Sequence, residues 1–540
     1  MMKRITSVQE NSFAQPSLGG STSRRRFLAG AAATVSLLAC NALSQAPIYG
    51  SIVGSVVRPE PRRPGELSDT GRLQRAIDQV RGQGGGTVAV PAGRYVSGTL
   101  RLHSHVSLWL DSGATLVMSK DPKEFLPIEK LNYDPKANLA TSNFQVALIV
   151  GDGVENISIA GGGTIDCDRT KSGGPKPIAL RRCSQVILRD ITIRNAPSYN
   201  ISLLGCEFVT LDNVTIRNGL SDGIDPDCSR YVRISNCFVE SVDDAIVLKS
   251  SGALGERRST EFITVDNCIL RTASIHFKCG TESCGDFRNI VVSNCIFQGG
   301  MGMRHGNPGI ALYTVDGGSL GNVVISNIVM QDVGTPVAIL RGDRDRCAFA
   351  AGPGSLQSIQ ISNVLATGAK LPSVIAGLPG SPVTGIVIDG LSVTMAASVK
   401  GTVDLQQIPE EPKDYPQPTM FGPLPAHAIF IRHASAVNLH NLRLQSGVGE
   451  TLPFLVADDV SDLRLASFQG NGASAPQLWL NNVRQSSVEL SSGNFSSTSC
   501  RISGPKTAAL SFPGIDVTVN RKLVHLDADV HPSAVQSQRN

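Results

Sequence analysis

A ten-residue pattern recurs through the middle of the chain, at steps of 23, 23, 31, 27 and 33 residues. Each copy places an Asn or Asp between alternating apolar residues, as in "VTLDNVTIRN" and "VRISNCFVES". The shared position falls at Asp190, Asn213, Asn236, Asn267, Asn294 and Asn327. Strict apolar alternation is typical of half-buried strands, and no helical periodicity separates the copies. The pattern therefore predicts short strands repeated as the coils of a solenoid, rather than strand–helix–strand units.

Stacked coils of this kind form a parallel β-helix, so the chain is predicted to be an all-β protein. Each coil leaves its strand edges unpaired until the next coil stacks on it, at about 4.8 Å. The recurring Asn can pass side-chain hydrogen bonds from one coil to the next. Cys237, Cys268 and Cys295 directly follow it and are predicted to stack as a buried column. Most of the 12 cysteines are therefore expected to be reduced, small core residues.

A single β-helix domain is expected over residues 47–525, followed by a polar C-terminal tail over 526–540. Roughly 490 residues exceed the usual size of one compact domain unless the fold grows along a line, as a solenoid does. One helical stripe lies near the start of this domain, at Leu73, Ala76, Ile77 and Val80. A short N-terminal capping helix at this place would cover the edges and the apolar core of the first coil.

Residues 1–46 have the pattern of a twin-arginine-type export signal. A polar lead is followed by "STSRRRFLAG" and by the apolar run "AAATVSLLAC", which is too short to span a bilayer as a permanent helix. Two cleavage sites fit this segment: an ordinary cut near Ala46, and a lipoprotein cut that would leave Cys40 lipidated. We therefore expect an exported protein, periplasmic or extracellular, that contacts a membrane only through such an anchor.

Acidic residues gather beside predicted strands in "GLSDGIDPDCSRYVRISNCFVESVDDAIVLKS", residues 219–250. Asp222 and Asp243 are 21 residues apart, which is close to one coil. Since residues one coil apart stack, Asp222 should lie near both Asp243 and Asp244. Three carboxylates in such a space repel one another, and at least one should keep its proton to unusually high pH. A protonated and an ionised carboxyl facing one groove are the groups that hydrolyse a glycosidic bond.

These segments resemble the polygalacturonase family of glycoside hydrolases, family 28, in its divergent bacterial branch. "SDGID", followed one coil later by "DDAIVLKS", is similar to the family's N-T-D-G-I-D and D-D, and "GGGTVAVPAGRYVSGTL" also resembles it. The resemblance implies a right-handed parallel β-helix of the pectin-lyase-like type. It also implies that Asp243 is the general acid and that Asp222 and Asp244 activate the water of an inverting hydrolysis, with no cofactor and no metal.

Three family positions differ in this chain. The family's G-H-G aligns near "RTASIHFKCGTES", where Ser274 stands at the His position and His276, two residues on, is expected on the same face. The family's R-I-K aligns in "GIALYTVDGG", where Ala311 and Tyr313 replace the Arg and Lys that would bind a galacturonate carboxylate. We therefore expect the substrate to be a plant-type polysaccharide, pectic or related, other than plain polygalacturonate.

Further polar residues lie close to the acids in the predicted coils. The candidates for binding substrate or for orienting the acids are Asp225, Lys249, His276, Lys278 and Glu282. Asp225 is expected in a turn where it orients Asp222. Arg304 and Arg432, each followed by a His, are interpreted as surface cations.

Two rival functions fit the same sequence. A polysaccharide lyase on the same solenoid would bind calcium through clustered Asp and abstract a proton with Lys249 or Lys278. A noncatalytic carbohydrate-binding protein would account for the missing family residues as lost activity. In each case the partner is a polysaccharide or oligosaccharide, since a net charge of +4 without a basic stripe argues against nucleic acid. We expect the protein to be a monomer.

Overall fold

The structure is a computed structural model that describes residues 55–137, 139–347, 349, 354–396, 403–473, 476–490, 499–515 and 523–536. The chain divides into two units, residues 1–52 and Val53–Asn540, and all described residues belong to the second. The predicted export signal and Cys40 lie outside the described residues. None of the helices in the described part is long and apolar enough to cross a membrane.

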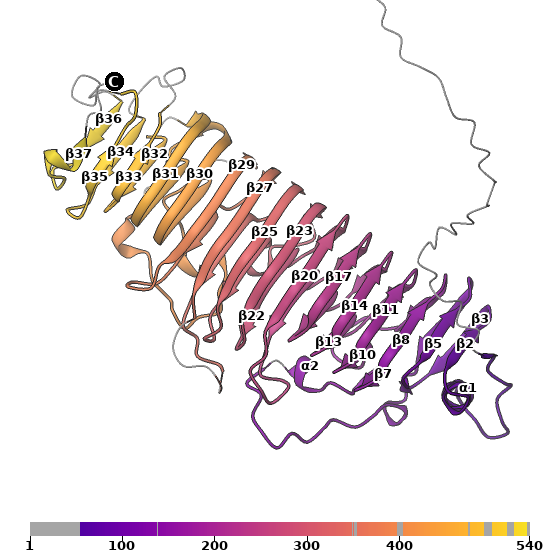
Figure 1. Ribbon diagram of the computed structural model, residues 1–540. Helices are drawn as coiled ribbons and strands as arrows, with labels where there is room; N and C mark the ends of the chain where they lie inside the picture. Colours follow the sequence, from indigo (N-terminus) through magenta and orange to yellow (C-terminus); the bar gives the residue numbers. More distant parts are fainter. Residues whose placement is uncertain are drawn as a thin grey trace, which may run out of the picture. The chain divides into compact units, whose positions relative to one another are not determined.

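The described residues form 37 strands, and successive coils pair in parallel along the length of the unit (Figure 1). Strand pairing separates them into three stacks, of which the first carries the acidic residues. We call it the site stack: β4 (Leu100–Arg101), β7 (Ala147–Asp152), β10 (Lys176–Arg181), β13 (Ile201–Leu204), β16 (Ile224–Asp227), β19 (Ile246–Ser250), β22 (Phe277–Ser283), β24 (Pro308–Thr314), β26 (Thr335–Arg341), β28 (Ser373–Ala376), parts of β30 (Ile429–Glu450) and β31 (Leu455–Ala473), β32 (Leu478–Asn481), β34 (Cys500–Ser503) and β36 (Val524–Leu526).

The other two stacks complete each coil. The second contains β1 (Ser55–Val57), β2 (Gly86–Val90), β5 (Val106–Leu110), β8 (Glu155–Ala160), β11 (Ser184–Arg189), β14 (Glu207–Asp212), β17 (Arg230–Ser235), β20 (Thr260–Asp266), β23 (Phe287–Gln298), β25 (Leu320–Gln331), β27 (Leu356–Ala369), β29 (Val383–Met395), β33 (Arg484–Val488), β35 (Ala508–Ser511) and β37 (Val535–Gln536). The third contains β3 (Gly93–Ser97), β6 (Ala114–Met118), β9 (Thr164–Asp166), β12 (Thr192–Arg194), β15 (Thr215–Gly219), β18 (Phe238–Ser241) and β21 (Ile269–Thr272). Strand β23 pairs with β20 of the second stack and with β21 of the third stack. In β23, β25, β27 and β29 a single long strand therefore runs through both of these stacks. The predicted all-β parallel fold is thus confirmed.

A helix covers the first coils, as the apolar stripe predicted. Helix α1 (Thr70–Gly82) packs beside β1, β2, β4 and β5 at one end of the solenoid (Figure 1). Leu73, Ala76, Ile77 and Val80 are all buried there, so the helix shields the apolar core of the first coil from water. The remaining helical segments are short: α2 (Leu139–Ser142), η1 (Pro122–Glu124), η2 (Arg304–Gly306), η3 (Leu405–Gln407), η4 (Pro418–Phe421) and η5 (Pro532–Ala534).

The recurring Asn and Asp residues occupy a bend that requires left-handed backbone. At Asp190, Asn213 and Asn236 φ is 59°, 52° and 57°, a conformation that Asn and Asp tolerate better than other side chains. The predicted coil-to-coil hydrogen bonds occur: Asn213 Nδ2 donates to Asp190 Oδ1 at 2.9 Å, and Asn327 Nδ2 to Asn294 Oδ1 at 3.1 Å. The repeat is therefore set by backbone conformation as well as by the side-chain ladder.

Two further positions of the coil form stacked columns: the residue that follows the recurring Asn, and a residue five positions before that Asn. Cys237, Cys268 and Cys295 are all buried, as predicted. On the outer surface, the rings of Phe208, Tyr231 and Phe262 stack with centroids 4.7 and 4.9 Å apart. Side chains at the same position of successive coils thus stack both inside and outside the solenoid.

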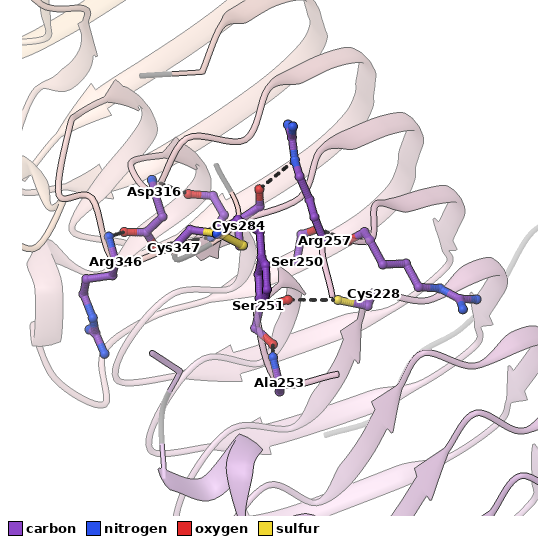
Figure 2. The surroundings of a disulfide bond; sticks show 12 residues. Cys228, Ser250, Ser251, Ala253, Arg257, Cys284, Asp316, Arg346 and Cys347 are labelled. Carbon is purple, nitrogen blue, oxygen red and sulfur yellow. Dashed lines mark hydrogen bonds between the residues drawn. A yellow bond between two sulfur atoms is a disulfide. The ribbon is translucent and has the colours of Figure 1, made fainter. Parts of the chain in front are cut away.

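Nine of the described cysteines are free and buried, which fits the prediction that most are reduced core residues. Cys284 and Cys347 differ, because they form a disulfide that joins two loops beside the site stack (Figure 2). Next to it the Arg257 guanidinium donates to the Cys284 carbonyl at 3.1 Å, and the Arg346 amide donates to Asp316 at 3.1 Å. These bonds and the disulfide connect the four loops that contain Arg257, Cys284, Asp316 and Arg346.

A long segment of the chain covers part of the site stack. We name residues 403–426 the strap; its side chains of Leu405, Ile408, Phe421, Leu424 and Ala426 form one buried apolar cluster with outward-facing residues of the site stack. At the C-terminal end, the residues expected as a polar tail include β37, which pairs with β35. Val530 and Ala534 are buried there, so this segment closes the last coil rather than fraying.

Candidate active site

Asp222 and Asp244 occupy equivalent positions of two adjacent coils. Each precedes a strand of the site stack, and the amide of Gly223 donates to the Asp244 carbonyl at 2.8 Å. Carboxylate oxygens of Asp222, Asp243 and Asp244 all lie within 4.8 Å of one another. The stacking of the three acids predicted from their spacing is therefore confirmed.

The acids line a cavity of about 260 Å³ on the outer face of the site stack. Its lining residues are Tyr199, Ser221, Asp222, Asp243, Asp244, Lys249, Lys278, Thr281, Glu282, Arg304, His305 and Tyr415. They come from four consecutive coils, from the loop that contains η2 and from the strap. A cavity with several convergent ionisable groups is the usual form of an enzyme active site.

Lys249 holds two of the acids in place. Its Nζ donates to Asp222 Oδ2 at 2.8 Å and to Asp225 Oδ1, and it lies 3.8 Å from the centre of the Tyr199 ring. Burial raises the pKa of Asp222 well above its usual range, and the nearby charges of Asp225, Asp243 and Asp244 add to this effect although Lys249 opposes it. Asp225 lies within β16 rather than in a turn, and it shares Lys249 with Asp222, which fits a residue that orients Asp222.

Asp244 has an environment of the opposite kind. Its Oδ2 accepts from Lys278 Nζ at 2.8 Å, and its Oδ1 accepts from Ser274 Oγ at 2.8 Å and from the Ile275 amide at 3.3 Å. Burial opposes ionisation of Asp244, but Lys278 and these hydrogen bonds outweigh it and lower its pKa. Neighbouring coils thus present one carboxyl with a raised pKa and one with a lowered pKa, and the crowding of the acids adds to the rise at Asp222.

Asp243 reaches furthest into the cavity. Its side chain is 24% exposed, whereas those of Asp222 and Asp244 are 8% and 6% exposed. Its Oδ2 lies 3.0 Å from Nη2 of Arg304, and its Oδ1 accepts from the Asp244 amide at 3.1 Å. Arg304, which the sequence suggested to be a surface cation, therefore belongs to the site.

His276 does not lie on the face of the acids, and the prediction that it could replace the missing family histidine is wrong. Its ring stacks on Phe297 inside the solenoid, with centroids 5.5 Å apart, and its Nδ1 pairs with the Pro308 carbonyl at 3.0 Å. The prediction assumed that residues two apart share a face, which holds only within a strand. At this corner two successive residues, His276 and Phe277, both face inward, as Ala245 and Ile246 do one coil earlier.

Lys278 and Glu282 do line the cavity, as predicted. Lys278 Nζ also donates to the Tyr415 hydroxyl at 2.9 Å, which connects the strap to the acids. Burial opposes ionisation of Glu282, but Lys249, Lys278 and Arg344 outweigh it and lower its pKa. The cavity thus contains a second ionised carboxylate on the coil after Asp244.

Tyr199, His305 and Tyr415 were not foreseen from the sequence. Tyr199 occupies the coil before Asp222, so its position could have been found by extending the coil register backward. His305 and Tyr415 pack together with ring centroids 4.5 Å apart, from η2 and from the strap. These two segments have no repeat, so the sequence contained no signal that would place them here.

Ala311 and Tyr313, which stand where the family has Arg and Lys, are fully buried under the strap. They belong to the apolar cluster with Leu405 and Phe421. Their side chains therefore pack against the strap and do not line the cavity of the acids.

The three acids could also be considered as a metal site, since their oxygens converge and calcium takes carboxylate ligands. However, Lys249 and Lys278 each place an ammonium 2.8 Å from one of these carboxylates. The two lysines supply the positive charge that a divalent cation would bring. The donor set therefore fits a hydrolytic acid cluster better than a cation site.

Arg432 and His433 lie in a different cavity of about 290 Å³, further along the site stack. Arg432 pairs with Glu410 at 2.7 Å and His433 with Asp459 at 2.8 Å. They are thus members of a charged network rather than isolated surface groups.

A parallel β-helix whose outward face carries three clustered aspartates defines a solenoid enzyme that acts on carbohydrate chains. The family model described as glycosyl hydrolases family 28 matches residues 88–412, which is more than half of the chain. The chain belongs to this family and is an O-glycosyl hydrolase.

Relatives agree with this assignment, and a solved structure agrees with the fold. The chain is 24% identical over 369 residues to a probable polygalacturonase of Vitis vinifera, covering 62% of this chain and 73% of the relative. It is 26% identical over 302 residues to an endo-polygalacturonase of Pectobacterium carotovorum, covering 50% and 71%. Among solved structures, it resembles the exopolygalacturonase of Thermotoga maritima with a TM-score of 0.53 and 22% identity, over 63% of this chain and 87% of that one. This likeness supports the right-handed β-helix fold.

Proposed function

We propose that the protein is an exported hydrolase that cleaves a pectin-type polysaccharide with inversion at the anomeric carbon. The observation that carries this proposal is the trio of Asp222, Asp243 and Asp244, with oxygens within 4.8 Å and with a raised pKa at Asp222 beside a lowered pKa at Asp244. The family and the polygalacturonases among its relatives support the substrate class.

Asp243 is the general acid in this proposal. It is the most exposed of the three and so is best placed to reach the oxygen of a glycosidic bond in the cavity. For this role Asp243 must carry a proton when substrate is bound, with Arg304 released from it, and must make hydrogen-bond contact with the departing sugar oxygen. The deeper acids are too enclosed to make this contact first.

Asp222 and Asp244 hold and activate the attacking water. Two oxygens within 4.8 Å can both accept from one water molecule, because each O–H···O bond spans about 2.7 Å. Asp244, kept ionised by Lys278 and Ser274, is the acceptor for the proton that the water loses. Lys249 fixes the orientation of Asp222 so that the water stays aligned.

Stereochemistry does not follow from carboxylate separation in this site. Two-carboxylate enzymes that invert have groups about 6.5–9.5 Å apart, and those that retain have groups about 5–5.5 Å apart. Here oxygens of three acids lie within 4.8 Å of one another. Asp222 and Asp244 can therefore share the water while Asp243 donates the proton. The anomeric form of the first product, followed by NMR in the seconds after cleavage, tests inversion; a retained anomer contradicts it.

The substrate is a sugar chain that does not depend on the family's Arg and Lys. Their positions, Ala311 and Tyr313, lie under the strap. Arg304 is the cation that a substrate carboxylate can reach, since its side chain is 46% exposed at the cavity. The experiment is to incubate the mature protein with a panel of pectic and other plant polysaccharides and to identify the released products. Release of reducing ends from none of them would contradict the proposal.

The lyase alternative needs a lysine free to accept a proton. Both candidates are buried and paired, Lys249 with Asp222 and Asp225, and Lys278 with Asp244. These carboxylates raise the pKa of both lysines well above the usual range despite burial, so neither is a ready base. A lyase would give unsaturated products that absorb in the ultraviolet and would lose activity with a chelator, whereas hydrolysis should give neither result.

The variant Asp243→Asn distinguishes the hydrolase from the noncatalytic alternative. Asp243→Asn should bind an oligosaccharide as well as the original protein does in either case. Only in the hydrolase does the original protein turn that oligosaccharide over while the variant does not.

Export through the twin-arginine route is part of the proposal and rests on the segment "STSRRRFLAG". Replacing Arg24 and Arg25 by Lys should leave the protein in the cytoplasm of the producing cell, as seen by fractionation. Mass spectrometry of the exported protein then distinguishes a cut near Ala46 from a lipidated Cys40. Export that is unchanged in the double variant would contradict this route.

A further inference from the structure

A second cavity of about 330 Å³ lies on the site stack, toward the N-terminus from the acids. Its lining residues are Ile128, Asn143, Val146, Gly173, Gly174, Lys176 and Ser198. Ser198 lines this cavity, and the next residue, Tyr199, lines the acid cavity. The two cavities therefore adjoin along the outer face of the solenoid.

Lys176 stands in the same row of the site stack as Asp222. Ile178, Ile201 and Ile224 are register partners in successive coils, and Lys176, Tyr199 and Asp222 each lie two residues before one of them. Two coil spacings of about 4.8 Å place the backbone of Lys176 about 10 Å from that of Asp222. A polysaccharide lying along this row would contact both positions.

The ammonium group of Lys176 is buried without a carboxylate partner. The residue is 1% exposed, and its Nζ donates to the carbonyls of Asn143 at 3.1 Å and Phe144 at 3.5 Å. These two carbonyls account for two of its three N–H donors. Among the described residues no carboxylate lies within ion-pair distance of Lys176, in contrast to Lys249 and Lys278.

The nearest acidic group on the loop that covers Lys176 is already engaged. Glu129 accepts from Arg181 through both oxygens, at 2.9 Å each. On the other side, Asp225 is bonded to Lys249. A buried ammonium costs free energy unless it is paired, so an anion that enters this cavity would remove an existing penalty.

Burial lowers the pKa of Lys176 to about 7, although Asp225 raises it in part and Lys249 adds to the lowering. An anion bound beside the amine would favour its charged form. The amine thus lies near the balance of its neutral and charged forms at pH 7, and a bound anion shifts it toward the charged form.

We propose that the cavity around Lys176 binds the carboxylate of a uronic acid unit, two coils toward the N-terminus from the acids that cleave the chain. The inference rests on the proposed function and extends it, because it gives the substrate an acidic sugar at a fixed distance from the bond that is cut. It also supplies a cationic contact in a chain whose family Arg and Lys positions are covered by the strap.

The test measures binding rather than turnover. In an Asp243→Asn background, which prevents hydrolysis, calorimetry compares trigalacturonate with the neutral trimer of β-1,4-linked galactose. Lys176→Met should weaken trigalacturonate binding about tenfold or more and change binding of the neutral trimer less than twofold. Hydrolysis of the polysaccharide panel by the unaltered protein is scored separately, so a failed subsite and a failed hydrolase proposal give different results.

A second variant covers the case in which Lys176→Met does not fold. Ser198 lines the same cavity, and Ser198→Asp places a fixed carboxylate there. This variant should bind trigalacturonate about tenfold more weakly and bind the neutral trimer with unchanged affinity. Equal weakening of both trimers would mean that Lys176 only holds the Asn143 and Phe144 carbonyls. That result would overturn the inference. So would variants that bind trigalacturonate with unchanged affinity. The inference also fails if the protein hydrolyses a neutral polysaccharide but does not bind trigalacturonate.

Discussion

The substitution Asp243→Asn tests the catalytic assignment most directly. General acid catalysis contributes about 10²–10⁴ in rate. At 1.36 kcal/mol per factor of ten, this equals about 2.7–5.4 kcal/mol of transition-state stabilisation. Because an amide has no proton to give to the departing oxygen, kcat should fall by about this factor.

The same substitution should leave stability nearly unchanged. Asp243 forms an ion pair with Arg304 in which both side chains are partly exposed, and such pairs contribute about 0–1 kcal/mol. Against this loss, the variant removes one acid group from three that lie within 4.8 Å of one another. An Asn can still accept the hydrogen bond from the Asp244 amide through its side-chain oxygen. We expect the free energy of unfolding to change by less than about 1 kcal/mol.

The assay is the release of reducing ends from the best substrate of the panel, paired with thermal unfolding of each protein. Asp462→Asn is a matched control, since Asp462 faces Arg464 at 3.4 Å on the surface of a distant coil. The control should keep full activity. An Asp243→Asn protein that retains more than about a tenth of kcat would refute the role assigned to this residue.

Three further changes should act on stability in distinct ways. Lys278→Met leaves Asp244 as an uncompensated buried charge and should cost about 3–5 kcal/mol in denaturant unfolding; a loss under 1 kcal/mol would contradict the buried pair. The proton on Asp222 stabilises the fold below the ordinary pKa of an Asp, and this stabilisation is lost as pH rises through the raised folded pKa. Asp222→Asn should therefore gain in melting temperature relative to the original protein from about pH 4 upward, and parallel pH curves would argue against it. Tyr231→Ala removes the middle ring of the exposed aromatic stack and should cost about 1–3 kcal/mol in unfolding with unchanged turnover, whereas a loss of turnover would show that the stack serves the site.

The repeat predicted the solenoid because its period is a direct record of the coil. Asn213 and Asn236 are 23 residues apart, and the structure places them at the same bend of adjacent coils. The spacing of Asp222 and Asp243 predicted their proximity for the same reason, since residues one coil apart must stack. Residue positions predicted from the coil period were therefore correct.

The alternation of inward and outward side chains did not hold where a strand had not yet begun. His276 precedes β22 at a corner where two successive residues face inward, so its side chain lies in the core. Tyr415 and His305 reach the cavity from segments without a repeat, and their positions depend on how the strap packs on the apolar face of the site stack. Such packing is a long-range property that no local pattern encodes.

The disulfide was missed because Cys284 and Cys347 lie 63 residues apart in different loops. Cys237, Cys268 and Cys295 sit at one position of the repeat, and this regular context correctly indicated a packing role. Cys284 and Cys347 fall outside that context, and this difference was the available signal.

The coil that joins Asp222 to Asp243 contains β16, β17 and β18 with turns of only two residues between the strands. The next coil carries the longer connection 251–259 between β19 and β20, and the strap lies much further along the chain. The parts that hold the acids and the parts that shape the rim of the cavity are thus separate pieces of sequence. Grafting rim segments from other solenoids, or lengthening them at random, would vary the sugar that is admitted while the catalytic distances stay those of the backbone pitch.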